Sequence, residues 1–177
     1  MNFSVLISIY KKENPLFLNL SLESVLVNQS LLPNQVVIVK DGNITKELEL
    51  VLNKYVKLFP QIIKICGYAD NKGLGFALNF GLDKCSNEIV FRMDADDICH
   101  FKRFESQLPA IQKNGISIVG SNIEEFNYEI GDLKNIRKLP CKSSDINMFM
   151  LYRNPFNHMT VVFKKSKIQS VGGYLEM

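Results

Sequence analysis

The stretch Ile89-Val90-Phe91-Arg92-Met93-Asp94-Ala95-Asp96-Asp97 decides the fold that this sequence predicts. Its apolar first part is short and β-branched, which is typical of a buried strand, and it ends in three closely spaced carboxylates. A strand that opens into acids places them at the carboxyl edge of a sheet, where open α/β sheets bind ligands. Clustered Asp oxygens without Cys or His suit a hard cation, Mg²⁺ or Mn²⁺, shared with a phosphate ligand. The other interpretation that stays open is a turn of solvated Asp residues that caps a helix.

The composition predicts one globular domain over residues 1–177, because 46% of the residues are hydrophobic and 22% are charged. The net charge of +3 is too small for a dedicated nucleic-acid binder. The four cysteines form no CxxC pair, so we expect reduced thiols in a cytoplasmic protein rather than a zinc site. The chain enters a strand almost at once, so we expect no signal peptide, and no apolar run approaches the roughly 18 residues of a membrane span.

Strands and helices alternate along the chain. This order predicts an α/β fold, a doubly wound and mostly parallel sheet with helices on both faces. The segment 124–140 is irregular and is interpreted as loops and short strands. Pro109 should lie near the start of its helix or kink it. The expected strands are 3–9, 35–40, 62–66, 89–93, 116–120 and 160–163, and the main helices begin near Pro15, Thr45, Gly75, Phe101, Ser143 and Lys165.

Polar residues from separate segments should meet at the same edge of this sheet. Tyr10 follows the first strand, Asp41 ends the second, and Asp94 follows the fourth. The loop from Asn71 to Gly75 contains two glycines and opens a helix whose amino end could face an anion. By itself such a loop is a weak signal, but its convergence with the acids indicates a ligand site.

Taken together, these segments resemble the family 2 glycosyltransferases, which have the nucleotide-sugar-binding GT-A fold. The resemblance is best to bacterial capsule and exopolysaccharide members of the amylovoran-biosynthesis type. It spans nearly the whole chain, and the order and spacing of its segments make it specific. The segments are Phe3–Tyr10, Ser24-Val25 with Asn28-Gln29, Val37–Gly42, Asn71–Gly75 with Ala77–Gly81, Arg92–Asp97 with Arg103-Phe104, Arg153–His158 and Gly172-Gly173-Tyr174.

The resemblance implies a donor site for a nucleotide sugar, most simply a UDP-sugar. Asp96 would bind the Mn²⁺ or Mg²⁺ ion that bridges the diphosphate, and Asp94 would face the ribose or the metal. Asp41 would contact the uracil, although it could be only a turn residue, and Tyr10 could line the base pocket or simply pack. Many members carry a second Asp where this chain has Lys40, which makes the base contact less certain. The donor-binding set that the resemblance implies is Tyr10, Asp41, Asn71, Gly73, Asp94 and Asp96.

The other residues near the cluster have open assignments. Asp97 could support the metal site or cap the next helix. His158, with its neighbour Asn157, borders the acceptor side and could contact acceptor or phosphate, although a structural histidine is the simpler interpretation. His100 could lie beside the metal, although an exposed residue at a helix start is the simpler interpretation.

The implied reaction is an inverting, metal-dependent sugar transfer to a saccharide or lipid-linked saccharide in bacterial surface polysaccharide synthesis. The family's general base follows the Gly-Gly-Tyr turn, so we expect it beyond Met177 and expect the chain to be truncated at its carboxyl end. We do not assign that role to Glu176. The alternative is a nucleotide-sugar-binding fragment without turnover. Peripheral contact with the inner face of the cytoplasmic membrane is expected by analogy only. A nucleotidylyltransferase would need glycines after the first strand, where 8–13 has none.

Overall fold

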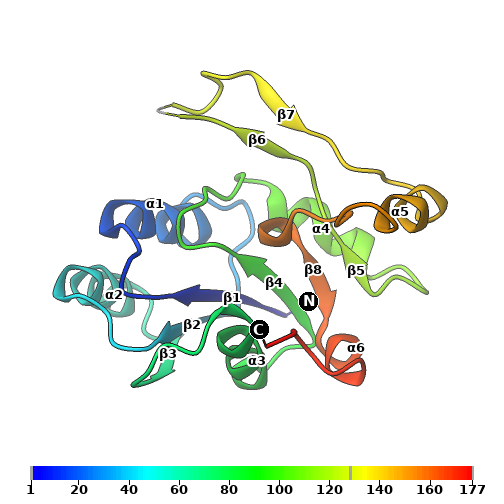
Figure 1. Ribbon diagram of the computed structural model, residues 1–177. Helices are drawn as coiled ribbons and strands as arrows, with labels where there is room; N and C mark the ends of the chain where they lie inside the picture. Colours follow the sequence, from blue (N-terminus) through cyan, green and yellow to red (C-terminus); the bar gives the residue numbers. More distant parts are fainter. Residues whose placement is uncertain (1, 128, 177) are drawn as a thin grey trace.

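The computed structural model describes residues 2–127 and 129–176, and a six-stranded sheet forms its centre (Figure 1). The strand order is β3-β2-β1-β4-β8-β5. The pairs that β1 forms with β2 and β4 are parallel, as is the pair of β2 with β3, whereas β8 runs antiparallel to both β4 and β5. The bounds are β1 Phe3–Ile9, β2 Gln35–Asp41, β3 Ile63–Tyr68, β4 Ile89–Met93, β5 Ile118–Val119 and β8 Val162–Lys164.

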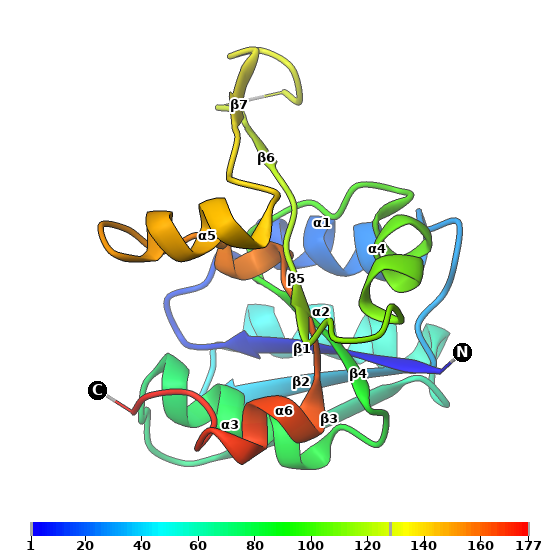
Figure 2. The ribbon, with the colours of Figure 1, turned by 90° about the vertical axis from the view of Figure 1, so that its right-hand side faces the viewer.

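Helices cover both faces of the sheet, so the predicted doubly wound, mostly parallel architecture is confirmed (Figures 1 and 2). One face packs against α1 (Pro15–Leu26), α2 (Lys46–Leu58) and α4 (Arg103–Ile111). The other packs against α3 (Leu74–Lys84) and α6 (Lys165–Ser170). On the first face Phe3, Phe91 and Phe104 form an aromatic cluster with ring centroids 4.8–5.1 Å apart, which fixes α4 on the sheet.

A two-stranded hairpin leaves the body of the protein where the sequence was irregular. It consists of β6 (Ile123–Glu125) and β7 (Asn135–Arg137), which pair antiparallel, and the chain then enters α5 (Ser143–Met150). Both views show the hairpin extending away from the sheet (Figures 1 and 2). None of the helices in the described ranges is both long and apolar enough to cross a membrane.

Several predicted boundaries shift for identifiable reasons. The helix from Pro15 ends at Leu26 rather than near residue 29. The N–H groups of Val27 and Asn28 both donate to the carbonyl of Glu23, and past the helix the Gln29 side chain donates to the carbonyls of Ser24 and His100. The last strand begins at Val162, because His158–Thr160 forms a 3₁₀ turn, η1. Pro109 lies in the last turn of α4, not near its start, and the helix ends two residues later.

Candidate functional site

The carboxyl ends of three neighbouring strands bring the predicted polar residues to one edge of the sheet. Strand β1 lies between β2 and β4 and runs parallel to both. Tyr10 directly follows β1, Asp41 is the last residue of β2, and Asp94 directly follows β4. The structure therefore places these residues at the edge where the sequence predicted a site.

The acid cluster consists of Asp94, Asp96 and Asp97, each of which offers a carboxylate oxygen within 4.8 Å of the other two. Asp96 is exposed, and the backbone carbonyl of Asp94 accepts a 2.8 Å hydrogen bond from Ser21 Oγ of α1. Burial and then the charges of Asp94 and Asp96 raise the pKa of Asp97 to about 6. Its Oδ2 is buried and has no hydrogen-bond partner among the described residues. This donor set of oxygens fits a hard divalent cation.

The structure excludes one of the two roles left open for Asp97. Helix α4 begins at Arg103, with Lys102 at the N-cap position and no side-chain capping bond. Asp97 therefore does not cap this helix and belongs with the acid cluster. His100 is exposed and accepts a 3.3 Å hydrogen bond from the Lys102 backbone, in agreement with its expected place before the helix.

Two charged residues at the acid cluster were not found by sequence reasoning. Glu13 lies in the loop between β1 and α1, and burial together with the charges of Asp96 and Asp94 raises its pKa. Arg92 lies within β4, is 1% exposed, and forms an ion pair with Asp94. A charged residue inside an apolar strand was the available signal for Arg92. Glu13 gave none, because acids are common in loops.

A buried hydrogen-bond network holds the end of β4. The guanidinium of Arg103 donates from Nη2 to the carbonyl of Arg92 at 2.8 Å and from Nε to Gln107 at 3.0 Å. Gln107 in turn donates to the carbonyl of Thr160 at 3.0 Å. Helix α4 therefore connects the strand that carries the acids to the η1 turn. Buried polar groups satisfied in this way fix a single arrangement.

Asp41 is buried, and its carboxylate faces the loop that opens α3. Oδ1 accepts from the backbone N–H of Lys72 at 2.7 Å, and Oδ2 accepts from the N–H of Gly73 at 3.0 Å. The side chain of Asn71 donates to the same Oδ2 at 2.9 Å. Gly73 has φ +87°, a conformation that glycine adopts without strain. Three of the predicted donor residues therefore form one unit, and Asp41 organises the glycine loop.

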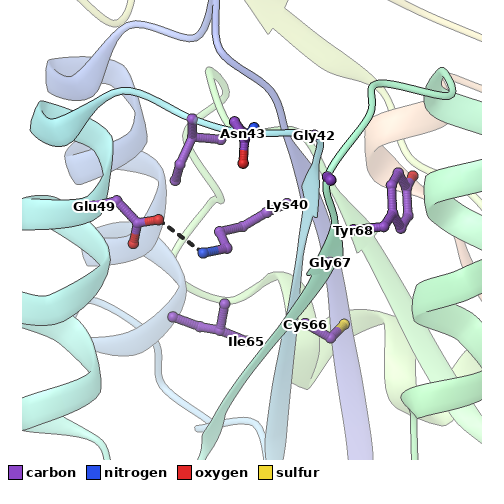
Figure 3. A pocket seen from close by; sticks show the side chains of 10 residues that line it. Lys40, Gly42, Asn43, Glu49, Ile65, Cys66, Gly67 and Tyr68 are labelled. Atoms are coloured by element: carbon purple, nitrogen blue, oxygen red, sulfur yellow. Dashed lines mark hydrogen bonds and ion pairs between the residues drawn. The ribbon is translucent and has the colours of Figure 1, made fainter.

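Lys40 faces the opposite side of the sheet from this loop. Its ammonium forms a 2.8 Å ion pair with Glu49 of α2, beside a hollow of about 410 Å³ between the β2–β3 edge and that helix (Figure 3). Tyr68 lies on the other side of the strands in the same view. The described residues that line the hollow do not include the acid cluster or Tyr10, which is 38% exposed beyond β1.

The two residues predicted on the acceptor side differ in their surroundings. Asn157 is buried and donates to the Ser121 carbonyl at 3.1 Å, so its amide holds a loop. His158 begins η1, with its ring 5.6 Å from that of Tyr174. Burial and then the charge of Arg92 lower the pKa of His158 to about 4, so the ring is neutral at neutral pH.

The turn at Gly172–Tyr174 returns to α3. Asn79 accepts a 2.7 Å hydrogen bond from the Tyr174 N–H and donates a 2.9 Å bond to the Tyr174 carbonyl. The ring of Tyr174 also packs near Phe163 of β8. The described carboxyl-terminal segment is therefore attached to the helix that the glycine loop opens.

Comparison with protein families gives a match to the model described as Glycosyl transferase family 2, over residues 4–172. The chain is 43% identical over 173 residues to UDP-Gal:alpha-D-GlcNAc-diphosphoundecaprenol beta-1,3-galactosyltransferase of Escherichia coli, covering 97% of this chain and 62% of that protein. It is 42% identical to the amylovoran biosynthesis glycosyltransferase AmsE of Erwinia amylovora, covering 97% and 63%. The chain thus spans less than two thirds of the length of these two curated relatives.

Solved structures share the fold at low sequence identity. The mannosyltransferase PcManGT from Pyrobaculum calidifontis, in complex with GDP-Man and Mn²⁺, superposes with a TM-score of 0.71 at 15% identity, covering 99% of this chain and 48% of that one. S. aureus TarS 1-349 in complex with UDP-GlcNAc gives 0.72 at 20% identity, covering 98% and 48%. The likeness agrees with the sheet topology, and the expected GT-A fold is confirmed.

Proposed function

This chain belongs to glycosyl transferase family 2, and from that premise we propose that it binds a nucleotide-diphosphate sugar, a UDP-sugar, as donor for an inverting transfer to a saccharide. The observation that carries the proposal is the acid cluster at the carboxyl end of β4, beside the loop that Asp41 organises. The Escherichia coli relative is named for a UDP-Gal donor, and TarS has been solved with UDP-GlcNAc, which support UDP as the nucleotide.

We assign the donor contacts to the residues at this edge. Asp96 is the most exposed acid of the cluster and is the first candidate to hold Mn²⁺ or Mg²⁺, with Asp94 beside it at the ribose or the metal. When bound, such an ion would stabilise the charge that develops on the departing diphosphate. Tyr10 extends beyond β1 next to this edge, where its ring could cover the base. Asn71 and Gly73 lie in the loop that opens α3, held by Asp41 at the same edge, and we assign them to the donor-binding side of the site.

A thermal-shift experiment tests donor binding directly. UDP with Mn²⁺ at about one hundred times its Kd should stabilise the native chain by about 2.7 kcal/mol, because ligand binds the folded state alone. For a chain of this length that corresponds to a Tm increase of about 5–10 °C. Asp96→Asn should remove the Mn²⁺-dependent part of the shift. Asp145→Asn, an exposed carboxylate on α5, is the matched control and should leave the shift intact. An unchanged shift in Asp96→Asn would reject the metal assignment.

For the acceptor we propose a saccharide carried on a lipid, as in the substrate for which the Escherichia coli relative is named. Helix α5 supports contact with a membrane surface, because none of its residues is buried. Residues 134–153 contain five cationic side chains and only one acid, a charge that favours anionic lipids. In Figure 2, α5 projects on the same side as the arrowhead of β1, where the site lies. Four exposed side chains form what we call the α5 surface: Met148, Met150, Leu151 and Tyr152.

Sedimentation with vesicles tests this contact. The chain should bind vesicles that contain phosphatidylglycerol and not those of phosphatidylcholine alone. Leu151→Ser should weaken binding by about tenfold or more, because each large apolar side chain buried contributes roughly 1.5–3 kcal/mol. Leu50→Ser is the control, since Leu50 of α2 is 69% exposed, similar to the 72% of Leu151, but lies outside the α5 surface. Equal loss in both variants, or no binding to anionic vesicles, would reject the proposed surface.

A further inference from the structure

Arg92 is the buried cation at the acid cluster, and its surroundings fix where its charge lies. It is the fourth residue of β4 and is almost fully buried. Its Nη1 forms an ion pair with Oδ1 of Asp94, and neither Nε nor Nη1 has a hydrogen-bond partner among the described residues. The charge of Arg92 also acts on the partly buried rings of His158 and Tyr174: it adds to burial in lowering the pKa of His158, and it partly offsets the burial that raises the pKa of Tyr174. The guanidinium therefore lies between the acids and the η1 turn.

The backbone of Arg92 is held on both sides, so its position is set by the fold. Its N–H donates to the carbonyl of Val161 at 2.9 Å, and its carbonyl accepts the bond from Arg103. A guanidinium in such a place cannot turn to solvent without exposing the core. The side chain of Asp94, by contrast, is partly exposed, so the position of its carboxylate is set by the guanidinium of Arg92. Arg92 is thus the fixed member of the pair, and Asp94 is the member that is positioned.

One oxygen of Asp94 is consequently engaged by a cation of the protein itself. A second cation on that oxygen would lie close to the guanidinium and be repelled by it. Asp94 can then offer a divalent ion a single oxygen, and bidentate coordination is disfavoured. The distinction matters for the choice of metal. Ca²⁺ takes six to eight oxygens and readily uses bidentate carboxylates, whereas Mg²⁺ requires near-octahedral coordination by few carboxylates together with water and phosphate.

We propose that Arg92 is a positioning residue that sets the metal preference of the site. By confining Asp94 to one oxygen, it favours small octahedral ions, Mn²⁺ and Mg²⁺, over Ca²⁺. Arg92 does not touch donor or metal in this role and acts only through Asp94. The inference rests on the proposed function, because it concerns the ion that would accompany the nucleotide.

The test measures UDP affinity by titration calorimetry in the presence of Mn²⁺ and of Ca²⁺. The wild-type chain should bind UDP more tightly with Mn²⁺. Arg92→Met keeps the side-chain volume and removes the charge, so Asp94 becomes free to offer both oxygens. The ratio of the UDP Kd with Ca²⁺ to the Kd with Mn²⁺ should fall by about tenfold in this variant, because a bidentate carboxylate suits the larger ion. A loss of packing alone would weaken both complexes equally and leave the ratio unchanged, which would overturn the inference.

A second variant retains the buried arginine and guards against misfolding of the first. In Asp94→Asn, the remaining carboxylates hold the ion, so the ratio should stay within about twofold of wild type if Asp94 supplied only one oxygen. A selective loss of Ca²⁺-supported binding would show that Asp94 is bidentate in the native site, and would overturn the inference. If the wild-type chain binds UDP with neither ion, the proposed function itself fails. Wild-type binding with Mn²⁺ and an unchanged ratio in Arg92→Met rejects only the role of Arg92.

Discussion

Substitution of Asp41 by Asn should destabilise the whole fold through the loop that opens α3. The carboxylate accepts three hydrogen bonds, from the backbone N–H groups of Lys72 and Gly73 and from the side chain of Asn71. An asparagine keeps one acceptor oxygen and turns its NH₂ group toward an N–H donor. The variant therefore loses the charge on every bond and at least one bond entirely.

The magnitude follows from these contacts. Hydrogen bonds to a charged group contribute about 1.5–3 kcal/mol each, and a buried donor left without a partner costs about 1–3 kcal/mol. Since the oxygen of asparagine can still accept from one or two donors, the free energy of unfolding should fall by about 2–4 kcal/mol. With a urea dependence of about 2 kcal/mol per molar, the unfolding midpoint should move down by about 1–2 M.

The assay is urea unfolding monitored by circular dichroism, and two further variants serve as comparisons for Asp41→Asn. Asp70→Asn makes the same chemical change at an exposed residue next to the loop and should shift the free energy by less than about 0.5 kcal/mol. Asn71→Ala removes one donor and leaves both backbone bonds, so its effect should be near 1 kcal/mol. The reasoning is refuted if Asp41→Asn unfolds at the same urea concentration as Asp70→Asn. In that case the loop would not depend on the carboxylate.

Further changes test packing and charge elsewhere in the chain. Gly81→Ala should lower the free energy of unfolding by about 1–3 kcal/mol although alanine has the better helix propensity, because a Cβ would lie 2.4 Å from Leu6 Cδ1 and 2.5 Å from Val39 Cγ2. Urea unfolding measures this change, and a gain in stability would contradict the close packing. The pKa of His158 is lowered to about 4, so wild type should lose stability relative to His158→Gln as pH falls from 6.5 toward 4. The pKa of Asp97 is raised to about 6, so wild type should lose stability relative to Asp97→Asn as pH rises from 4 toward 6. For either residue, if the free energy of unfolding depends on pH in the same way in wild type and variant, that residue is not the cause of the pH dependence.

Much of the sheet could be predicted, because strand periodicity and turn composition are local signals. The first strand, Phe3–Ile9, was predicted with its observed bounds, and the order of strands and helices led to the correct layers. Local patterns do not reveal contacts with residues that are distant in the sequence, and such contacts form where an element ends. Just past the early end of the first helix, the Gln29 side chain bonds to His100, seventy-one positions away. No property of the sequence near Gln29 reveals that contact.

The candidate site was predictable where its residues interrupt a pattern. Asp94 and its neighbours end an apolar run, and Asp41 precedes a glycine turn, so both were visible in the sequence. The direction in which a side chain points could not be predicted from the sequence. The bonds of Asp41 to the glycine loop depend on how β2 and α3 pack, and the burial of Asn157 depends on its bond to Ser121.

The charges at the acid cluster bear on the proposal that a divalent ion binds there. Four carboxylates interact electrostatically here, those of Glu13, Asp94, Asp96 and Asp97. Two buried cations act on them: Arg92, which is paired with Asp94, and Arg103, whose charge acts on Asp97. Burial, and after it the charges of Asp94 and Asp96, raise the pKa of both Glu13 and Asp97. The arrangement is understandable if a divalent ion and its diphosphate complete the charge balance, with Arg92 limiting how Asp94 takes part.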